Sequence, residues 1–145
     1  MVREPALHVA EKLEHLLPLA MSVLFSNSED PMAATSVGQL RIIRQLVGGP
    51  KSPSRIAEVL NLTPGAVTQH VTRLKAAGLV TDEADSHDRR LKIVKLTADG
   101  KHKMDRRAIL RSESAVRVLS RLSQETRERL VICLEEVIRV AQEAT

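Results

Sequence analysis

Apolar residues recur at helical spacing from Ala6 to about Phe25, which predicts an amphipathic helix over this stretch. The positions that share one face of it are Leu13, Leu16, Leu17, Ala20, Met21 and Leu24. Pro18 stands inside the pattern. Because proline has no amide proton to donate inside a helix, we expect the helix to kink or restart at this residue.

A second helix is predicted after a polar, turn-rich break at residues 26–31. Ser36 is its expected N-cap, since Gln39 stands three residues later and completes a capping box. Its apolar stripe consists of Leu40, Ile43, Leu46 and Val47. The helix should end at residues 48–50, Gly-Gly-Pro, where glycine allows a left-handed conformation and proline cannot continue the helix.

Two short helices joined by a tight turn are predicted in the middle of the chain. Each begins with a hydroxyl residue followed by proline, at Ser52-Pro53 and at Thr63-Pro64, which is the pattern of an N-cap and a first helical position. Asn61 and Gly78 are expected to end them. The inward positions are Ile56, Ala57 and Leu60 in the first helix and Val67, Val71 and Leu74 in the second. This arrangement is a helix-turn-helix signal.

Short β-branched segments replace the helical spacing after Gly78. Residues 79–84 and 91–97 are predicted to form the two strands of a hairpin, joined by a polar turn at 85–88. Thr97 is then expected to cap a long helix that extends to about Leu119, and Ser123 a last one. The last helix aligns Leu130, Leu134, Val137, Ile138 and Ala141.

The order of these elements predicts a mainly α protein with a small β-hairpin wing, that is, a winged helix-turn-helix with long helices at both ends. We expect a single domain over residues 1–145, with a winged-helix lobe at about 35–97 and dimerisation helices at about 6–26 and 98–144. The terminal helices carry more apolar surface than a core of three small helices can use. Burial against a second copy of the chain is therefore expected.

Composition narrows the classes of function. The chain has 145 residues, of which 43% are hydrophobic and 28% charged, so a packed core is expected rather than a disordered tail. It has no Trp or Tyr and a single Phe, which argues against RNA and single-strand binders that stack bases on aromatic side chains. Without a long apolar run or a signal peptide, we expect a soluble, cytoplasmic protein and no membrane contact.

The titratable residues give no sign of catalysis or of metal binding. One cysteine excludes a disulfide framework and a cysteine-rich zinc site, and the five histidines show no close ligand spacing. The sequence also lacks a phosphate-binding glycine loop, a nucleophile elbow and an HExxH motif. We therefore expect no enzyme, no metal and no cofactor. A small buried hydrophobe is the favoured interpretation of Cys133, and a redox-sensing thiol is the alternative.

The formal net charge of +4 is compatible with nucleic acid, although on charge alone a solvated charged face is the favoured interpretation. With the apolar stripe inward, a turn of about 100° per residue places one set of residues of the helix at 64–77 outward: Gly65, Thr68, Gln69, Thr72, Arg73 and Ala76. Gly65 and Ala66 are short enough for close approach, and glutamine can bond bidentately to adenine in the major groove. An ordinary polar surface helix is the alternative.

The first turn of the preceding helix holds residues that could contact the phosphate backbone of DNA. Ser54 and Arg55 stand at its first turn, where unpaired amide groups and the helix dipole favour a phosphate. For Ser52 the capping role is favoured. Lys51 and Lys75 are further candidates for phosphate contact.

The tip of the hairpin supplies the last candidates. Arg89 and Arg90 stand where a guanidinium can enter a narrow minor groove. Asp88 beside them cannot favour DNA by charge, so we expect it to orient an arginine through a carboxylate fork. A solvated charged turn is the alternative.

The stretch from Ser36 to Leu134 resembles the MarR family of bacterial transcription regulators. The residues that carry the resemblance are Gln39-Leu40, Ile56-Ala57, Leu60, Leu62-Thr63-Pro64, Val67-Thr68, Leu74, Gly78-Leu79-Val80, Asp88-Arg89-Arg90, Leu96-Thr97, Gly100 and Leu122-Ser123. The most specific element is Asp88-x-Arg90 followed by Leu96-Thr97, a spacing that the family shows at its wing. Pro18 and the lack of tyrosine and tryptophan depart from the family pattern.

The resemblance implies a homodimer that binds a palindromic operator in double-stranded DNA, with one winged module on each half-site. It further implies a repressor that a small-molecule effector or an oxidant regulates, with an effector pocket between the dimer helices and the DNA-binding lobe. The departures from the family pattern leave the identity of the effector open. A winged-helix module for protein–protein interaction, without an operator, is the alternative function.

Overall fold

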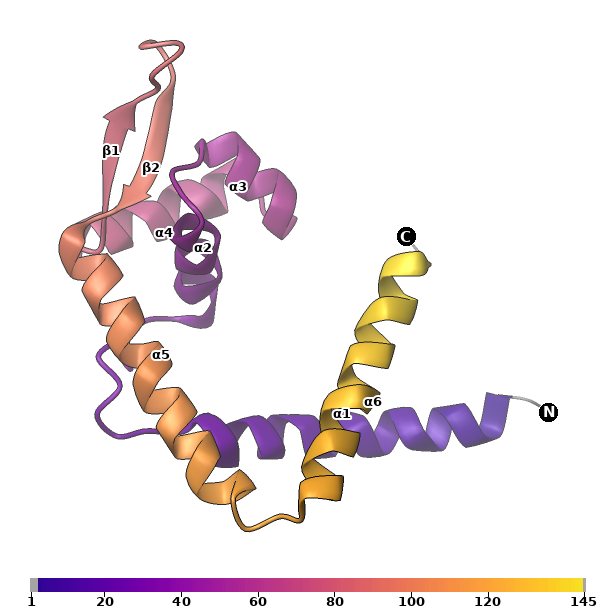
Figure 1. Ribbon diagram of the computed structural model, residues 1–145. Helices are drawn as coiled ribbons and strands as arrows, with labels where there is room; N and C mark the ends of the chain where they lie inside the picture. Colours follow the sequence, from indigo (N-terminus) through magenta and orange to yellow (C-terminus); the bar gives the residue numbers. More distant parts are fainter. Residues whose placement is uncertain (1–2, 145) are drawn as a thin grey trace. The chain divides into compact units, whose positions relative to one another are not determined.

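Figure 1 shows the computed structural model, which describes residues 3–144. The described elements are α1 (Arg3–Phe25), α2 (Val37–Val47), α3 (Pro53–Leu60), α4 (Pro64–Ala76), β1 (Val80–Ala84), β2 (Lys92–Leu96), α5 (Ala98–Leu119) and α6 (Gln124–Glu143). This order confirms the mainly α class with a β-hairpin wing. Residues 1, 2 and 145, the ends of the predicted domain, lie outside the described residues.

The chain separates into two compact units. One consists of residues 29–108 and contains the predicted winged-helix lobe; the other combines the residues up to 28 with those from 109 onward.

The predicted caps are present in the 29–108 unit. At the start of α2, Ser36 N donates to Gln39 Oε1 at 2.9 Å and Gln39 N donates to Ser36 Oγ at 3.2 Å, which is a complete capping box. Ser52 Oγ accepts from the backbone of α3 at 3.2 Å and Thr63 Oγ1 from that of α4 at 3.1 Å. The hydroxyl-proline pairs therefore set both starts of the helix-turn-helix.

The helix ends follow from the backbone angles that the residues there allow. Asn61 ends α3 in the left-handed conformation, with φ of 51°, and Gly78 follows α4 with φ of 72°. At the end of α2 the C-cap Gly48 is right-handed, with φ of −78°, and the next residue, Gly49, has the positive φ of 128°. The Gly-Gly pair thus ends α2 as predicted, through its second member.

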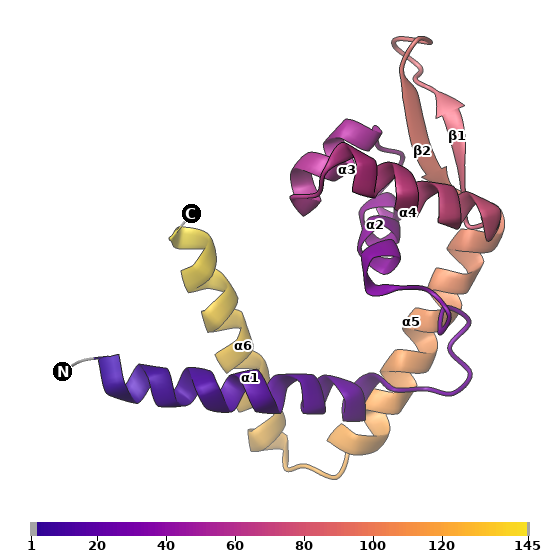
Figure 2. The ribbon, with the colours of Figure 1, turned by 180° about the vertical axis from the view of Figure 1, so that it is seen from behind.

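The core of this unit lies between α2, α3, α4 and the hairpin. Its buried side chains are Met32, Ile42, Ile43, Leu46, Ile56, Leu60, Val67, Val71, Leu74, Leu79, Val80 and Val94. In Figure 2, α4 passes across α2, and these two helices are in contact. Burial of Val67, Val71 and Leu74 confirms the predicted inward face of α4 and turns the opposite face to solvent.

Two glycines allow close approach inside this unit. A Cβ added at Gly38 on α2 would lie 2.7 Å from Nε2 of His70 on α4, whose Nδ1 is buried without a hydrogen-bond partner. A Cβ added at Gly100 on α5 would lie 2.1 Å from the carbonyl oxygen of Leu79. Since real Cβ atoms do not come that close, Gly100 has to be glycine beside the backbone of Leu79, whereas a Cβ at position 38 would require the His70 ring to shift.

The hairpin is antiparallel, with Val80 opposite Leu96 and Ala84 opposite Lys92. It extends from the helices with its turn at the free end (Figure 1). Lys51, between α2 and α3, exchanges two backbone hydrogen bonds with Val94, at 3.0 and 2.8 Å. These bonds anchor the base of the wing and leave the tip in solvent.

Thr97 joins the base of the hairpin to α5. Its hydroxyl donates to the carbonyl oxygen of Gly78 at 2.6 Å and accepts from Gly100 N at 3.0 Å. The capping role predicted for Thr97 is confirmed.

In the other unit, α1 is a single helix of 23 residues with Pro18 inside it. Of the kink or restart predicted at Pro18, the restart is wrong, and the kink stays a prediction. A proline removes one backbone hydrogen bond, but the turns on both sides of it keep theirs. The end of α1 is held by Asn27 Nδ2, which donates to Ser114 Oγ at 3.2 Å, and by Arg111, whose guanidinium lies 4.6 Å from the centroid of the Phe25 ring.

The helices of this second unit expose much apolar surface, as predicted. No residue of α6 is buried. The exposed large side chains include Leu7, Leu13, Leu16, Leu17, Met21, Leu130, Leu134, Val137 and Ile138. Cys133 on α6 is exposed as well, so the burial predicted for it is wrong for the single chain. Within residues 3–144, no helix is both long and apolar enough to cross a membrane.

Candidate nucleic-acid interface

The solvent face of α4 carries the residues that were predicted to face outward. Gly65, Thr68, Gln69, Thr72 and Arg73 are exposed, and Ala66 beside them is half-buried. A Cβ added at Gly65 would meet nothing within 4 Å. The backbone at the start of α4 is therefore open to the surface of a partner.

The residues of this face differ in whether their side chains already make hydrogen bonds within the chain. Thr68 Oγ1 donates to Pro64 O at 3.0 Å, and Thr72 Oγ1 donates to Thr68 O at 2.8 Å. Each hydroxyl has one proton, so both threonines can only accept while these bonds last. The Gln69 side chain makes no hydrogen bond within the described part of the chain, and its amide offers a donor and an acceptor. Gln69 can thus form a bidentate contact that needs one donor and one acceptor.

The start of α3 has two further candidates, both exposed. Ser54 Oγ lies 3.2 Å from Ser52 Oγ, the capping hydroxyl. Arg55 NH1 lies 2.8 Å from Glu58 Oε2, and more than half of both side chains is exposed. Such a pair is weak in water and can open, so Arg55 stays available to a phosphate at a small cost.

Lys75 has a partner that the sequence analysis missed. Its ammonium group pairs with Asp82 of β1. The two residues line a cavity of about 200 Å³ between α4 and the hairpin, as does Lys92, which the sequence analysis also missed. The period of two along β1 puts Asp82 on the same face as the buried Val80, and this signal could have identified the pair. A phosphate would have to compete with Asp82 for Lys75.

Backbone N–H groups in the turn of the wing donate hydrogen bonds to a carboxylate oxygen. Asp85 Oδ1 accepts from the backbone N–H of Asp88 at 3.0 Å and from that of His87 at 2.7 Å. These two hydrogen bonds to its charged form hold the pKa of Asp85 below its ordinary value. The ionised carboxylate therefore fixes the fold of the turn.

Asp88 and Arg90 contact each other at the tip. Asp88 Oδ1 accepts from Arg90 N at 3.0 Å and from Arg90 Nε at 3.2 Å. The predicted carboxylate fork is therefore wrong in its geometry, because one oxygen takes both bonds. The side chain of Arg90 is 91% exposed. Arg89 is also exposed and has no ion-pair partner among residues 3–144.

The geometry combines an exposed face of one helix with a hairpin whose arginines project into solvent. Residues 35–91, from the segment before α2 to the residue before β2, match the sequence profile of the MarR family. This lobe is similar to the MarR family. No curated protein matches the sequence.

Solved structures extend the likeness to both compact units. A MarR-like transcriptional regulator of Thermotoga maritima is 29% identical over 94% of this chain and 96% of its own, with a TM-score of 0.72. YusO of Bacillus subtilis is 23% identical over 98% of both chains, with a TM-score of 0.67. Apo MarR of E. coli is 21% identical over 88% of this chain and 95% of its own, with a TM-score of 0.67. The chain has the fold of MarR-family transcriptional regulators.

Proposed function

We propose that the chain is a sequence-specific regulator of transcription that binds double-stranded DNA. It acts as a homodimer on a palindromic promoter site, as a repressor that a small-molecule effector releases. The observation that carries this proposal is the wing: Arg90 is almost fully exposed, yet its Nε is held 3.2 Å from Asp88 Oδ1. An exposed guanidinium held in one orientation is available to the negative potential of a DNA groove.

Within this proposal, α4 reads the major groove. Gln69 bonds a base edge, and Gly65 and Ala66 let the backbone approach the duplex. Thr68 and Thr72 accept hydrogen bonds from base amino groups. Residues that contact phosphate surround this helix: Ser54, Arg55, Arg73 and Lys75.

The wing enters the minor groove beside it. A narrow minor groove concentrates negative potential, which favours an inserted arginine. Arg90 fills this role, with Asp88 as the positioning residue, and Arg89 contacts the groove or its phosphates.

The homodimer is proposed from the apolar helices at the ends of the chain. Burial of apolar surface contributes about 25 cal/mol per Å², and α6 buries none of its residues within the single chain. A second copy would cover α1 and α6 together. A two-fold dimer presents two reading helices to half-sites about 34 Å apart, one duplex turn, which is why the site is proposed to be palindromic.

The proposal is tested by selecting bound sequences from random duplexes and then measuring a shift assay on the selected site. Arg90→Ala should weaken binding at least about tenfold and flatten the slope of log affinity against log salt by about one unit per half-site. Its melting temperature should stay unchanged, because the side chain is exposed. Arg121→Ala removes an equal charge outside the proposed interface and serves as the matched control.

Two outcomes would contradict the proposal. If no sequence is enriched, the chain is not an operator-binding regulator, and the interaction module becomes the better account. If Arg90→Ala and Arg121→Ala weaken binding equally, the wing contributes only bulk charge.

A further inference from the structure

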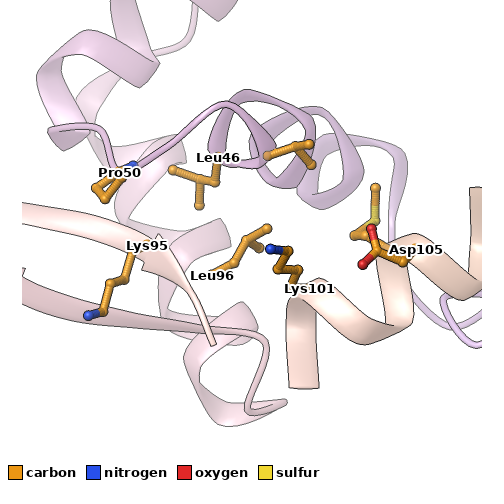
Figure 3. A pocket seen from close by; sticks show the side chains of 8 residues that line it. Leu46, Pro50, Lys95, Leu96, Lys101 and Asp105 are labelled. Atoms are coloured by element: carbon orange, nitrogen blue, oxygen red, sulfur yellow. The ribbon is translucent and has the colours of Figure 1, made fainter. Parts of the chain in front are cut away.

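A cavity of about 240 Å³ lies within the 29–108 unit, where the end of α2, the last residues of β2 and the first turns of α5 meet (Figure 3). Its apolar lining consists of Leu46, Val47, Pro50, Leu96 and Met104, and its charged lining of Lys95, Lys101 and Asp105. None of these residues belongs to the candidate nucleic-acid interface.

The three charged side chains differ in what they offer to a ligand. Lys95 Nζ lies 3.0 Å from Glu83 Oε2, and in Figure 3 it points away from the other lining residues. The ammonium group of Lys101 lies beside Leu96 in the same view. Neither Lys101 nor Asp105 has an ion pair or a side-chain hydrogen bond within residues 3–144. The cavity thus presents one unneutralised ammonium group and one unneutralised carboxylate.

Lys101 and Asp105 are one helical turn apart, yet they do not pair. A lysine that precedes an acidic residue by four positions has the less favourable order for an ion pair on a helix. Both groups are therefore left to the charges of a ligand. The apolar lining next to them favours a hydrocarbon body.

We propose that this cavity binds a small apolar α-amino acid as its zwitterion. The ligand carboxylate contacts Lys101, its ammonium group contacts Asp105, and its aliphatic side chain lies on Leu46, Leu96 and Met104. An anion without an amino group would be repelled by the carboxylate of Asp105. An amine without a carboxylate would be repelled by the ammonium group of Lys101. Pockets for drug-sized molecules measure about 300–1,000 Å³, so a cavity of about 240 Å³ suits a smaller ligand.

A ligand in the cavity would contact α2 and β2, the two elements that hold the candidate interface in place. β2 carries the wing, and α2 packs against α4. The role of the ligand as an effector rests on the proposed function, whereas its binding does not. The two are therefore measured separately.

The first measurement is calorimetric titration of the whole chain without DNA, using L-leucine, isocaproate, which lacks the amino group, and isoamylamine, which lacks the carboxylate. Leucine should bind about two- to fivefold more tightly than either fragment, since each fragment loses one exposed ion pair. Lys101→Met should weaken leucine and isocaproate by about the same factor and should strengthen isoamylamine, because it removes the charge that repels the ammonium group. Asp105→Asn should weaken leucine and isoamylamine and should strengthen isocaproate, because it removes the charge that repels the carboxylate.

Two further variants locate the site. Lys95→Met is the matched control and should leave all three affinities unchanged, because its ammonium group is paired with Glu83. Val47→Phe should abolish leucine binding by filling the cavity, and since Val47 is 61% exposed, folding should be unaffected.

The proposal is overturned if leucine fails to bind, if the three compounds bind equally, or if Lys95→Met acts like Lys101→Met. A shift assay with and without leucine then tests the effector role. Leucine binding with unchanged duplex affinity supports the site and contradicts only the effector part of the proposed function. A chain that binds leucine but no duplex supports the site and contradicts the regulator.

Discussion

Removing the acidic residue at the tip of the wing should weaken DNA binding, although it removes a charge that repels DNA. Asp88 Oδ1 accepts from both Arg90 N and Arg90 Nε, so it restricts an arginine that is otherwise surrounded by water. In Asp88→Ala the guanidinium would be free, and the duplex would have to order it.

Two opposing contributions set the size of the effect. Ordering a long side chain on binding costs about 0.5–1.5 kcal/mol. A carboxylate about 8 Å from a phosphate in water repels it by about 0.5 kcal/mol, and salt screens this further. The ordering cost exceeds the repulsion, so Asp88→Ala should weaken binding by about two- to fivefold per wing. Its melting temperature should hardly change, because the pair is exposed and contributes little to folding.

Fluorescence anisotropy on the selected duplex, at two salt concentrations, measures this change. Glu83→Ala is the matched control, since Glu83 is an acid of the same hairpin that pairs with Lys95 at 3.0 Å and does not contact Arg90. It should bind equally or slightly more tightly. Asp88→Asn keeps an acceptor oxygen and should restore most of the affinity. If Asp88→Ala binds as tightly as Glu83→Ala, the carboxylate does not position Arg90 and the reasoning fails.

Three other changes test the remaining parts of the structure. Gln69→Ala should weaken binding to the selected site by about 1–3 kcal/mol and relax one base preference per half-site; an equal loss on random duplexes would show that Gln69 reads no base. Leu134→Glu should give a monomer in analytical ultracentrifugation and remove operator binding, and an unchanged dimer would place the interface elsewhere. Gly100→Ala should lower the melting temperature by about 4–8 °C, because its Cβ would strike the carbonyl of Leu79, whereas Gly48→Ala, with nothing within 4 Å, should not.

Local sequence signals were sufficient to predict most of the helices and strands of the 29–108 unit. Ser36, Ser52 and Thr63 each cap a helix with their own side chain, so the starts of α2, α3 and α4 follow from a few adjacent residues. The inward face of α4 followed from spacing alone. These features depend on contacts between near neighbours, which a sequence displays directly.

The features that were missed depend on contacts between distant residues. The Lys75–Asp82 pair joins a helix to a strand, and the packing of Gly38 against His70 joins α2 to α4. The restart predicted at Pro18 does not occur. The hydrogen bond that proline removes can be read from the sequence, whereas the contacts of the rest of the helix, which outweigh this loss, cannot. The charged turn at 85–88 was predicted, but the single oxygen that holds Arg90 requires the backbone path of the turn.

The contact between Gly38 and His70 also predicts correlated substitutions at these two positions in related chains. A side chain larger than hydrogen at position 38 would meet the imidazole ring of His70, and the ring would have to shift. A larger residue at 38 is therefore expected together with another orientation of the ring, or with a smaller residue at 70. Relatives that keep this packing should show the two positions changing together.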